Sequence, residues 1–274
     1  MNNIRIASWN VNSIRARFDI LSKWLKKNQY DVIFVQETKV QDHEFPIDDI
    51  KNIGYEAIFL GQKSYNGVAI LSKEKIDIVN KNLPGDNKDD QARFLTSKIK
   101  DIELICIYLP NGNPIDTDKF PYKLKWMDRL TDYIKKKLNE NKKFVLAGDF
   151  NVIPKEIDVH NPESWTNDAL FHEDTLKKFW AMMNLGLTDA YRAINEDKVE
   201  YTFFDYKRVT NFINNKGLRI DHFLLPPSMI DKLDKCYIDS KLRGLEKPSD
   251  HVLLPLVFHI KTHPKPRQMD LEKN

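Results

Sequence analysis

The amino-acid sequence predicts an α/β protein in which packed β-sheets are flanked by helices. Short apolar strands recur along the chain, and amphipathic helices fall between only some of them, which favours packed sheets over a doubly wound parallel sheet. No internal repeat, low-complexity tract or Gly/Ser-rich linker divides the 274 residues, and this length fits one large domain. We therefore predict a single domain over residues 1–260, followed by a polar tail over 261–274.

The predicted strands are short runs of apolar residues bounded by polar or turn-forming residues. They cover residues 4–9, 32–35, 57–60, 68–71, 104–108, 144–147, 218–225 and 252–260. A turn from Gly61 to Gly67 joins the third of these strands to the fourth. Several of the strands run directly into acidic or amide residues, which places polar groups at the ends of rigid elements.

Three segments repeat apolar residues at the helical period. In the first, over residues 14–27, apolar side chains such as Ile14 and Leu21 share one face and leave the lysines on the other. The second covers residues 116–138 and the third roughly 172–185. Lysine clusters flank the second helix, and we interpret them as a solvated helix face.

Composition excludes several classes of protein. Hydrophobic residues make up 41% of the chain and charged residues 30%, as in folded globular proteins. The longest apolar runs are too short to span a bilayer and no secretory signal follows Met1, so we expect no membrane partner. Cys106 lies in an apolar run and is predicted to be a buried thiol, which favours the reducing cytoplasm. The net charge of +3 neither predicts nor excludes a polyanionic partner.

Carboxylates, amides and one imidazole lie at or near the ends of predicted strands, where a side chain is held firmly yet faces solvent. These residues are Asn10, Glu37, Tyr108, Asp149, Asn151, Asp221, Asp250 and His251. If these ends converge, the crowded carboxylates repel one another unless a hard cation neutralises them, and oxygen ligands suit Mg²⁺ or Mn²⁺. Zinc is disfavoured because no Cys/His pair has the spacing of zinc ligands.

Each of these residues also has a structural interpretation. Asp149 follows a glycine and fits a turn, and Glu37 fits a cap of the following segment. Asp221 is harder to explain in this way, because an ionised carboxylate inside an apolar strand is unfavourable unless it is paired or bound to a metal. Strand alternation sends Asp221 and His222 to opposite faces, so His222 is predicted to be solvent-facing or structural. Ser249 is interpreted as a surface residue.

Six motifs follow one another in a fixed order along the chain. They are Ala7-Ser8-Trp9-Asn10-Val11-Asn12, Gln36-Glu37-Thr38-Lys39, Tyr108-Leu109-Pro110-Asn111-Gly112, Gly148-Asp149-Phe150-Asn151, Gly217-Leu218-Arg219-Ile220-Asp221 and Glu246-Lys247-Pro248-Ser249-Asp250-His251. Together they resemble the motifs of the exonuclease III-type AP endonucleases (the exodeoxyribonuclease III family). The resemblance runs from about Ile4 to about Phe258, and although single motifs occur in related phosphoesterases, the ordered combination is specific.

The resemblance implies a four-layer α/β sandwich of the DNase I-like endonuclease/exonuclease/phosphatase fold, with two mixed sheets flanked by helices and the active site at one end. It implies a DNA repair nuclease that hydrolyses the phosphodiester 5′ to abasic sites and has 3′–5′ exonuclease and 3′-phosphatase or phosphodiesterase activity. The implied partner is double-stranded DNA with abasic sites or damaged 3′ ends. The implied cofactor is Mg²⁺, for which Mn²⁺ can substitute. We expect a cytoplasmic monomer that associates with the nucleoid through DNA.

The resemblance also implies which residues act on water and phosphate. Asp149, held by Asn10 and Asn151, would orient and deprotonate the attacking water, and Tyr108 is the alternative activating group. His251 would contact the phosphate oxygen on which charge builds up, as an imidazole that Asp221 biases toward its charged form. The residues implied to contact the scissile phosphate are Tyr108 and Asn111.

A metal site is implied at the same place. Glu37 would be the principal ligand, with Asn12 nearby and Asp250 at the metal or leaving-group side. The full predicted ligand set is Glu37, Asn12, Asp149, Asn151, Asp250 and His251.

Cations and apolar residues in the predicted loops are candidates for a DNA-binding surface. The cations are Arg15, Arg17, Lys39, Lys63, Arg93, Lys207, Arg208 and Lys216. On one face they would follow the phosphate backbone without reading sequence. Phe203, Phe204 and Leu218 are candidates for packing around a flipped-out abasic sugar, with core packing as the alternative for the two phenylalanines. Trp165 would either stack on a base or anchor a loop.

Two other functions fit part of the pattern. A phosphoesterase acting on a lipid or inositol phosphate headgroup would share the acids and the histidine, but the sequence lacks evident apolar loops for membrane docking. A DNA-binding module without catalysis would not need a competent residue at every matching catalytic position. The nuclease is therefore the favoured hypothesis.

Overall fold

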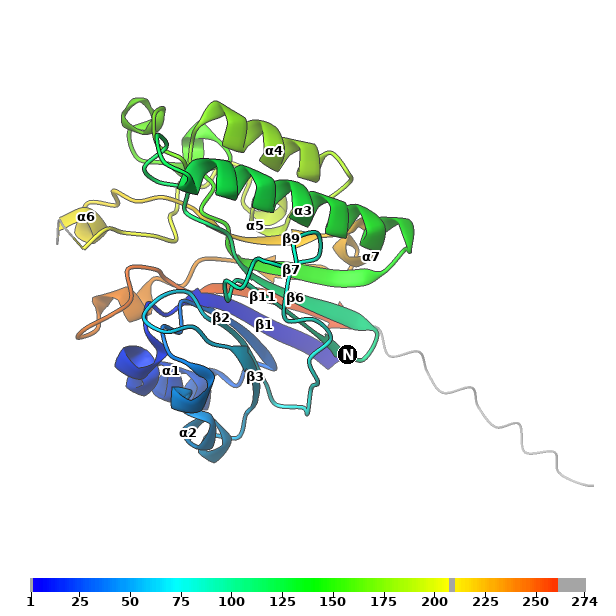
Figure 1. Ribbon diagram of the computed structural model, residues 1–274. Coiled ribbons are helices and arrows are strands. Elements are labelled where there is room, and N and C mark those ends of the chain that lie inside the picture. The colour runs from blue at the N-terminus through cyan, green and yellow to red at the C-terminus, as the bar shows by residue number, and fades with distance from the viewer. Residues whose placement is uncertain (1, 207–209, 261–274) are drawn as a thin grey trace, which may run out of the picture.

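Two β-sheets pack face to face, and helices cover the outer face of each sheet, so the computed structural model has four layers (Figure 1). This arrangement confirms the predicted α/β sandwich. The structure describes residues 2–206 and 210–260. The predicted tail over 261–274 and the cations Lys207 and Arg208 lie outside the described residues.

The first sheet is mixed and combines strands from both ends of the described chain. Its strands lie in the order β10-β11-β1-β2-β4-β3. Strand β1 pairs in parallel with β2 and antiparallel with β11. The bounds are β1 (Asn2–Asn10), β2 (Val32–Gln36), β3 (Glu56–Leu60), β4 (Val68–Ser72), β10 (Leu233–Cys236) and β11 (Leu254–Ile260).

The second sheet comes from the middle of the chain. Its strands lie in the order β5-β6-β7-β9-β8. Strands β6 and β7 are parallel, whereas β7 and β9 are antiparallel. The bounds are β5 (Phe94–Ile99), β6 (Ile102–Tyr108), β7 (Lys143–Asp149), β8 (Thr188–Asp189) and β9 (Asp221–Leu225).

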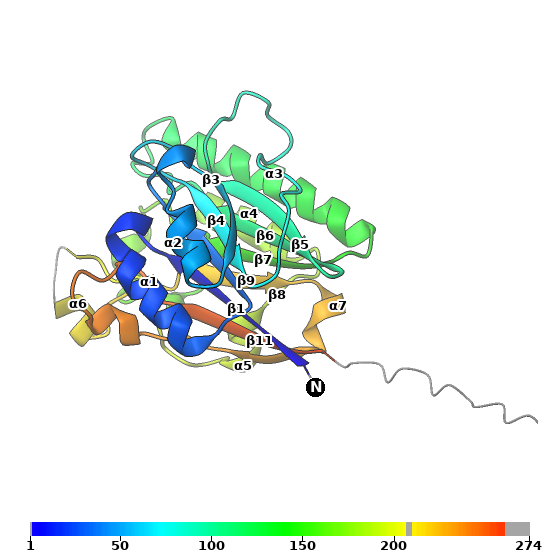
Figure 2. The same cartoon turned by 90° about the horizontal axis from the view of Figure 1, so that it is seen from below.

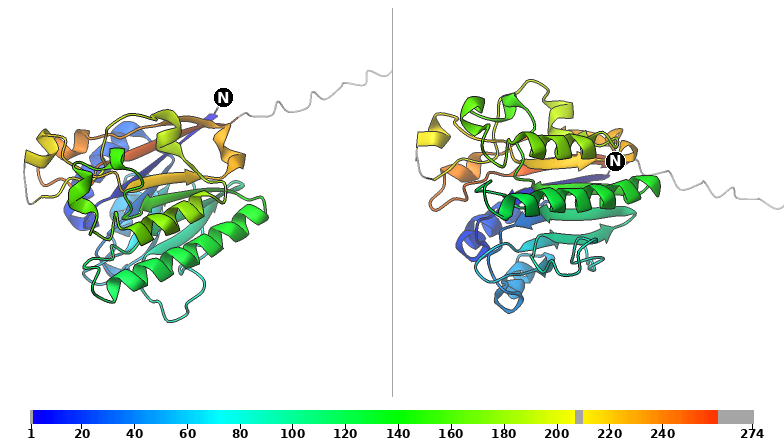
Figure 3. Two further views of the ribbon diagram at one scale, coloured as in Figure 1. Left: turned by 90° about the horizontal axis from the view of Figure 1, so that it is seen from above. Right: turned by 45° about the horizontal axis from the view of Figure 1, so that its top comes forward.

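Helices cover the two outer faces. Figure 2 shows α1 (Ile14–Asn28) and α2 (Ile47–Asn52) over the first sheet, and Figure 3 shows α3 (Lys119–Asn139) and α4 (Glu173–Met183) over the second. The shorter helices are α5 (Ala190–Ile194), α6 (Thr210–Ile213) and α7 (Pro227–Ile230). The three helices predicted from periodicity are thus α1, α3 and α4, each within a few residues of its predicted bounds.

The main core lies between the two sheets. Side chains such as Phe34 from the first sheet and Phe223 from the second meet there. Strands β2 and β4 are buried along their whole length because their other face is covered by helices. Cys106 is free and buried in this core, as predicted, and burial raises the pKa of its thiol to about 12.

Several predicted boundaries are wrong. The strand predicted over 218–225 begins only at Asp221, because Leu218 forms isolated bridges with Val159 and Phe203 instead of joining a sheet ladder. The strand predicted over 252–260 begins at Leu254, and the helix predicted from 116 begins at Lys119. The prediction missed β5, β8 and β10, which are short or carry polar residues on buried faces, as at Thr96 in β5.

Candidate active site

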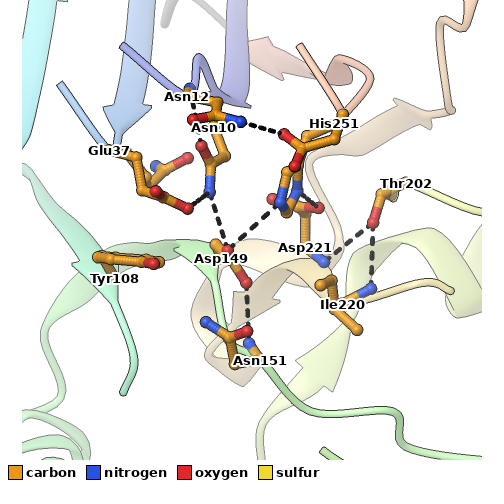
Figure 4. Close-up of polar contacts among 12 residues, drawn as sticks. Asn10, Asn12, Glu37, Tyr108, Asp149, Asn151, Thr202, Ile220, Asp221 and His251 are labelled. Atoms are coloured by element: carbon orange, nitrogen blue, oxygen red, sulfur yellow. Dashed lines mark hydrogen bonds and ion pairs between the residues drawn. The ribbon is translucent and has the colours of Figure 1, made fainter. Parts of the chain in front are cut away.

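Strand ends from both sheets bring the polar motifs together at one end of the sandwich (Figure 4). Asn10 is the last residue of β1, and Glu37 follows β2. Asp149 ends β7 and Asp221 begins β9, where the two residues are cross-strand partners. The predicted convergence of these residues is therefore observed, and each sheet contributes carboxylates to the cluster.

Asp149 lies at the centre of the cluster and is buried. Its Oδ2 accepts a hydrogen bond of 2.9 Å from Nδ2 of Asn10, which also donates to Oε1 of Glu37 at 2.8 Å. The backbone N–H of Asn151 donates to Asp149 Oδ1 at 2.9 Å. Burial raises the pKa of Asp149 to about 7, repulsion from Asp221 and Glu37 adds to this, and attraction to His251 opposes it.

The backbone of Asn151 contacts Asp149, whereas its side chain contacts the loop after β6. Its Nδ2 donates to the carbonyl of Leu109 at 2.9 Å, and its Oδ1 accepts from Nδ2 of Asn111 at 3.0 Å. Below this pair, the buried Lys123 of α3 donates to the carbonyls of Asn151 and Asn111 at 2.5 and 3.1 Å. Asn111 is thus tied to the loop that follows Asp149.

His251 faces two carboxylates from β7 and β9. Its Nδ1 lies 2.8 Å from Oδ2 of Asp221, and its Nε2 lies 3.6 Å from Oδ2 of Asp149. Burial alone would lower the pKa of His251, but attraction to Asp221 and Asp149 outweighs burial and raises it to about 10. The imidazole is therefore positively charged at neutral pH, with a proton on each nitrogen.

Ser249 is buried, so its interpretation as a surface residue was wrong. Its hydroxyl donates to the backbone carbonyl of Asn10 at 2.7 Å and accepts from the N–H of His251 at 3.2 Å. Trp9 Nε1 donates to the carbonyl of His251 at 3.1 Å. These contacts fasten the segment before β11 to the end of β1.

The oxygens around Glu37 already surround a positive charge. Lys39 Nζ lies 2.8 Å from Oε2 of Glu37 and 2.5 Å from Oδ1 of Asn12, whose Nδ2 donates to Oδ1 of Asp250 at 3.0 Å. Although burial opposes it, attraction to Lys39 and the hydrogen bond from Asn10 lower the pKa of Glu37. Carboxylate and amide oxygens that already hold an ammonium group fit a hard divalent cation.

Glu37, Asp149 and His251 form a group able to hold a metal, with one potential ligand atom of each within 4.8 Å of the others. A protonated imidazole, however, has no free lone pair to offer a metal. While both ring nitrogens of His251 carry protons, the carboxylates of Glu37 and Asp149 are the members of this group with oxygens free to bind a cation.

Tyr108 ends β6 beside Glu37, and Arg93 lies over its ring at 4.8 Å and donates to its carbonyl at 3.2 Å. Burial, followed by repulsion from Glu37 and Asp149, raises the pKa of Tyr108 well above its usual value. The phenol therefore stays protonated at neutral pH and is a hydrogen-bond donor.

A pocket of about 490 Å³ opens beside the acidic cluster. Its lining includes Phe203, Leu218, Lys216, Trp165, His160 and Asn161. The Phe203 ring packs edge-on against His251 with centroids 5.1 Å apart, so Phe203 borders both the pocket and the acidic cluster. Phe204 instead packs in the core against Tyr201, so the core alternative is correct for this residue.

The other predicted cations are spread more widely. Arg15 is exposed on α1 and pairs with Glu44 at 3.3 Å. Arg17 donates to the carbonyl of Asn12 at 2.7 Å and to the hydroxyl of Tyr206 at 2.8 Å. Lys63 is exposed between β3 and β4.

Sequence reasoning missed Thr202 and Lys123. The hydroxyl of Thr202 accepts hydrogen bonds from the N–H groups of Ile220 and Asp221 (Figure 4), and the motifs give no signal for this contact. Lys123 did leave a signal, because it lies one turn from Phe120 and Met127 on the buried face of α3. Burial lowers the pKa of Lys123 to about 7.

Residues 7–251 match the endonuclease/exonuclease/phosphatase family. The chain belongs to this family. Members of known activity are similar over almost their whole length: exodeoxyribonuclease III of Haemophilus influenzae is 32% identical over 262 residues, which span 90% of this chain and 97% of the relative. An exodeoxyribonuclease of Bacillus subtilis is 29% identical, spanning 94% of this chain and 100% of the relative.

Solved structures of family members agree with this assignment. An AP endonuclease from Archaeoglobus fulgidus is 40% identical, with a TM-score of 0.90 over 94% of this chain and 100% of that one. A 3′ phosphatase from Neisseria bound to a product DNA hairpin is 34% identical, with the same TM-score and coverage. The predicted exonuclease III-type family, its fold and a hydrolytic nuclease of DNA repair are confirmed. Within residues 2–206 and 210–260, no helix has both the length and the apolar composition needed to cross a membrane.

Proposed function

We propose that this chain cleaves the phosphodiester 5′ to abasic sites in double-stranded DNA and also trims damaged 3′ ends, including 3′-phosphates. The observation that carries the proposal is the charged His251 held between Asp221 and Asp149 at one wall of the pocket. That arrangement combines an acceptor for a proton of water with a cationic donor for phosphate.

Asp149 accepts the proton of the attacking water. Its two oxygens are oriented by Asn10 and by the backbone of Asn151, and its pKa of about 7 is close to the working pH, which suits a general base. Tyr108, the alternative, is a protonated phenol and donates to a phosphate oxygen instead. Asn111, tied to the same loop through Asn151, donates to the phosphate beside it.

His251 stabilises the charge that builds up on the phosphate oxygens. Its Nδ1–H donates to Asp221, and this bond orients the ring while the positive charge faces the cluster. A preorganised cation inside a buried site interacts with developing negative charge more strongly than it would in water.

Glu37 would anchor a divalent cation, with Asn12, Asp149, Asn151 and Asp250 as the other candidate oxygen ligands; we propose Mg²⁺, with Mn²⁺ as a substitute. Such a cation would neutralise charge on the phosphate oxygens. Lys39, now between Glu37 and Asn12, would turn to the DNA phosphates when the cation binds.

The pocket beside His251 would receive the extruded abasic sugar. Phe203 and Leu218 provide apolar contacts and Lys216 a cation at its rim. Arg15 and Arg93 are further candidates for phosphate contacts along the duplex. A monomeric state and a location in the cytoplasm with the DNA are part of the proposal.

Cleavage of a labelled duplex with one abasic site tests the function. We expect incision 5′ to the site with Mg²⁺, loss of incision with EDTA, and release of phosphate from a 3′-phosphorylated duplex. A headgroup phosphatase would instead release phosphate from inositol phosphates, and a binding module would retain the duplex without cutting it. Either outcome contradicts the proposal.

Glu37→Gln tests the metal assignment. Because an amide carries no charge to attract the cation, the Mg²⁺ concentration for half-maximal incision should rise by about tenfold or more, as for losses of other metal-binding contacts. Glu44→Gln, an acid of comparable type that pairs with Arg15 on the surface, is the control. An unchanged Mg²⁺ requirement in Glu37→Gln would refute its role as the ligand.

A further inference from the structure

We propose that Thr202 is a positioning residue that fixes the hydrogen bond between Asp221 and His251. The inference rests on the proposed nuclease function and names a residue on which the catalytic histidine depends. Thr202 belongs to a loop segment, residues 201–204, that passes between the chain leading into β9 and the chain leading into β11.

Backbone hydrogen bonds tie this segment to both neighbours. On one side, the N–H of Thr202 donates to the carbonyl of Leu218 at 2.8 Å. On the other side, the carbonyl of Thr202 accepts from the N–H of Val252 at 2.7 Å. Val252 directly follows His251, so Thr202 holds the backbone next to the histidine.

The hydroxyl of Thr202 holds the backbone of Asp221. Thr202 is fully buried, and its Oγ1 accepts from the N–H of Ile220 at 3.0 Å and from the N–H of Asp221 at 3.1 Å (Figure 4). Two buried N–H groups thus depend on one side-chain oxygen at the point where β9 begins. Burying them without an acceptor would be unfavourable, which makes the hydroxyl rather than the methyl group important here.

The carboxylate of Asp221 has little else to orient it. Its Oδ2 accepts from Nδ1 of His251 at 2.8 Å. In the part of the chain that the structure describes, its buried Oδ1 has no hydrogen-bond partner. The direction of the carboxylate is therefore set by its own backbone and by His251.

Asp221 and the segment of His251 belong to different sheets, so no single ladder of backbone hydrogen bonds fixes their separation. Thr202 contacts both, through its hydroxyl on one side and its carbonyl on the other. A shift of either backbone would lengthen the bond that orients the imidazole, and small misplacements of catalytic groups reduce turnover strongly.

The test compares Thr202→Val, which has the same shape but no hydroxyl, with Thr202→Ser, which retains it. We expect kcat on the abasic duplex to fall about ten- to a hundredfold in Thr202→Val, with KM changed less than about twofold, because the change acts on geometry rather than on DNA binding. Thr202→Ser should recover most of the turnover.

A structural readout separates this role from a general loss of stability. We expect the proton on Nδ1 of His251 to give a downfield NMR resonance, which would be assigned by its loss in His251→Asn. It should shift upfield or disappear in Thr202→Val and stay in place in Thr202→Ser. The matched control is Thr175→Val, which removes a fully buried hydroxyl that donates to Ala169 at 2.8 Å near the start of α4.

The proposal would be overturned if Thr202→Val kept the His251 resonance in place and turned over DNA as fast as the control Thr175→Val. If Thr202→Val does not fold, Thr202→Cys, which has a similar size and a weaker acceptor, is compared in the same way. If the wild-type protein does not cut DNA but the resonance responds as expected, the nuclease function fails and the positioning role of Thr202 is upheld.

Discussion

Two buried histidines lie on opposite sides of the second sheet and differ in charge at neutral pH. His251 contacts Asp221, and His222 is the next residue along β9 from that same aspartate. Both imidazoles are almost inaccessible to solvent. Burial lowers the pKa of each, yet that of His251 is raised to about 10 and that of His222 is lowered to about 4.

The partners explain the difference. Arg219 can only donate, so the Nδ1 of His222, 2.9 Å from its Nη1, accepts, and Nε2–H donates to the carbonyl of Val152 at 2.9 Å. His222 is therefore neutral. Arg219 itself balances Asp158 and Asp189, with contacts of 2.7 and 2.8 Å. Around His222, Arg219 supplies the positive charge that balances the aspartates. Around Asp149 and Asp221, His251 supplies it.

Burial lowers the pKa of both imidazoles, so the charges of the neighbouring side chains decide whether the net shift is upward or downward. A histidine between two carboxylates, such as His251, stays positively charged at neutral pH. A histidine beside an arginine becomes a neutral packing group, and Phe150 and Phe179 surround it accordingly. The solvent-facing interpretation of His222 was wrong, and the structural one is correct.

Replacing each histidine by asparagine should produce the largest contrast. In His251→Asn, kcat for incision is expected to fall on the order of 10³-fold, because a charged donor to the transition state is lost. His222→Asn should keep kcat within about threefold of wild type, since its ring does not reach the site. Single-turnover cleavage measures both, and DNA affinity by fluorescence anisotropy should stay nearly constant. Equal losses in the two variants would contradict the comparison.

Two aspartates, Asp158 beside Arg219 and Asp149 beside His251, should differ in their effect on stability. Asp158→Asn removes a charge that balances Arg219 and Arg192, so the free energy of unfolding should fall by about 3–5 kcal/mol. Asp149→Asn should leave it nearly unchanged or raise it, because a raised pKa means that ionisation of Asp149 is unfavourable in the folded state. Urea unfolding at neutral pH measures both free energies. Incision should be lost in Asp149→Asn, which remains folded, and retained by the folded fraction of Asp158→Asn.

The pH dependence of stability should give the smallest contrast. The pKa of His222 is lowered from 6.5 to about 4, so the unfolded chain binds its proton first and the free energy of unfolding decreases as pH falls from 6.5 toward 4. The raised pKa of His251 has the opposite sign: its contribution is present below 6.5 and is lost as pH rises toward 10. In His222→Gln, the free energy of unfolding should depend less on pH below 6.5 and should keep its dependence above 6.5. Urea midpoints measured across this pH range check this, and a change confined to pH above 6.5 would contradict the prediction.

The residues that sequence reasoning placed correctly are those whose role follows from strand position. Asp221 stood out because a carboxylate in an apolar strand needs a partner. Asp149 stood out because it ends a strand, and Glu37 because it directly follows one. Thr202 could not be found in this way, since its function depends on contacts with Asp221 and Val252, which lie far away in the sequence. The start of β9 was also misplaced, because apolar composition does not reveal whether Leu218 joins a ladder or a loop bridge.

The pairing of β1 with β11 also bears on how the protein is made. Asn2 lies opposite Ile260, so β1 is made before the other described strands but has one edge covered only when the last described strand, β11, pairs with it. A nascent chain that extends only through β9 contains Asp149 and Asp221 but lacks His251. If His251 acts as proposed, hydrolysis requires the docking of β11, which pairs with β1 and follows the segment that brings His251 to the cluster.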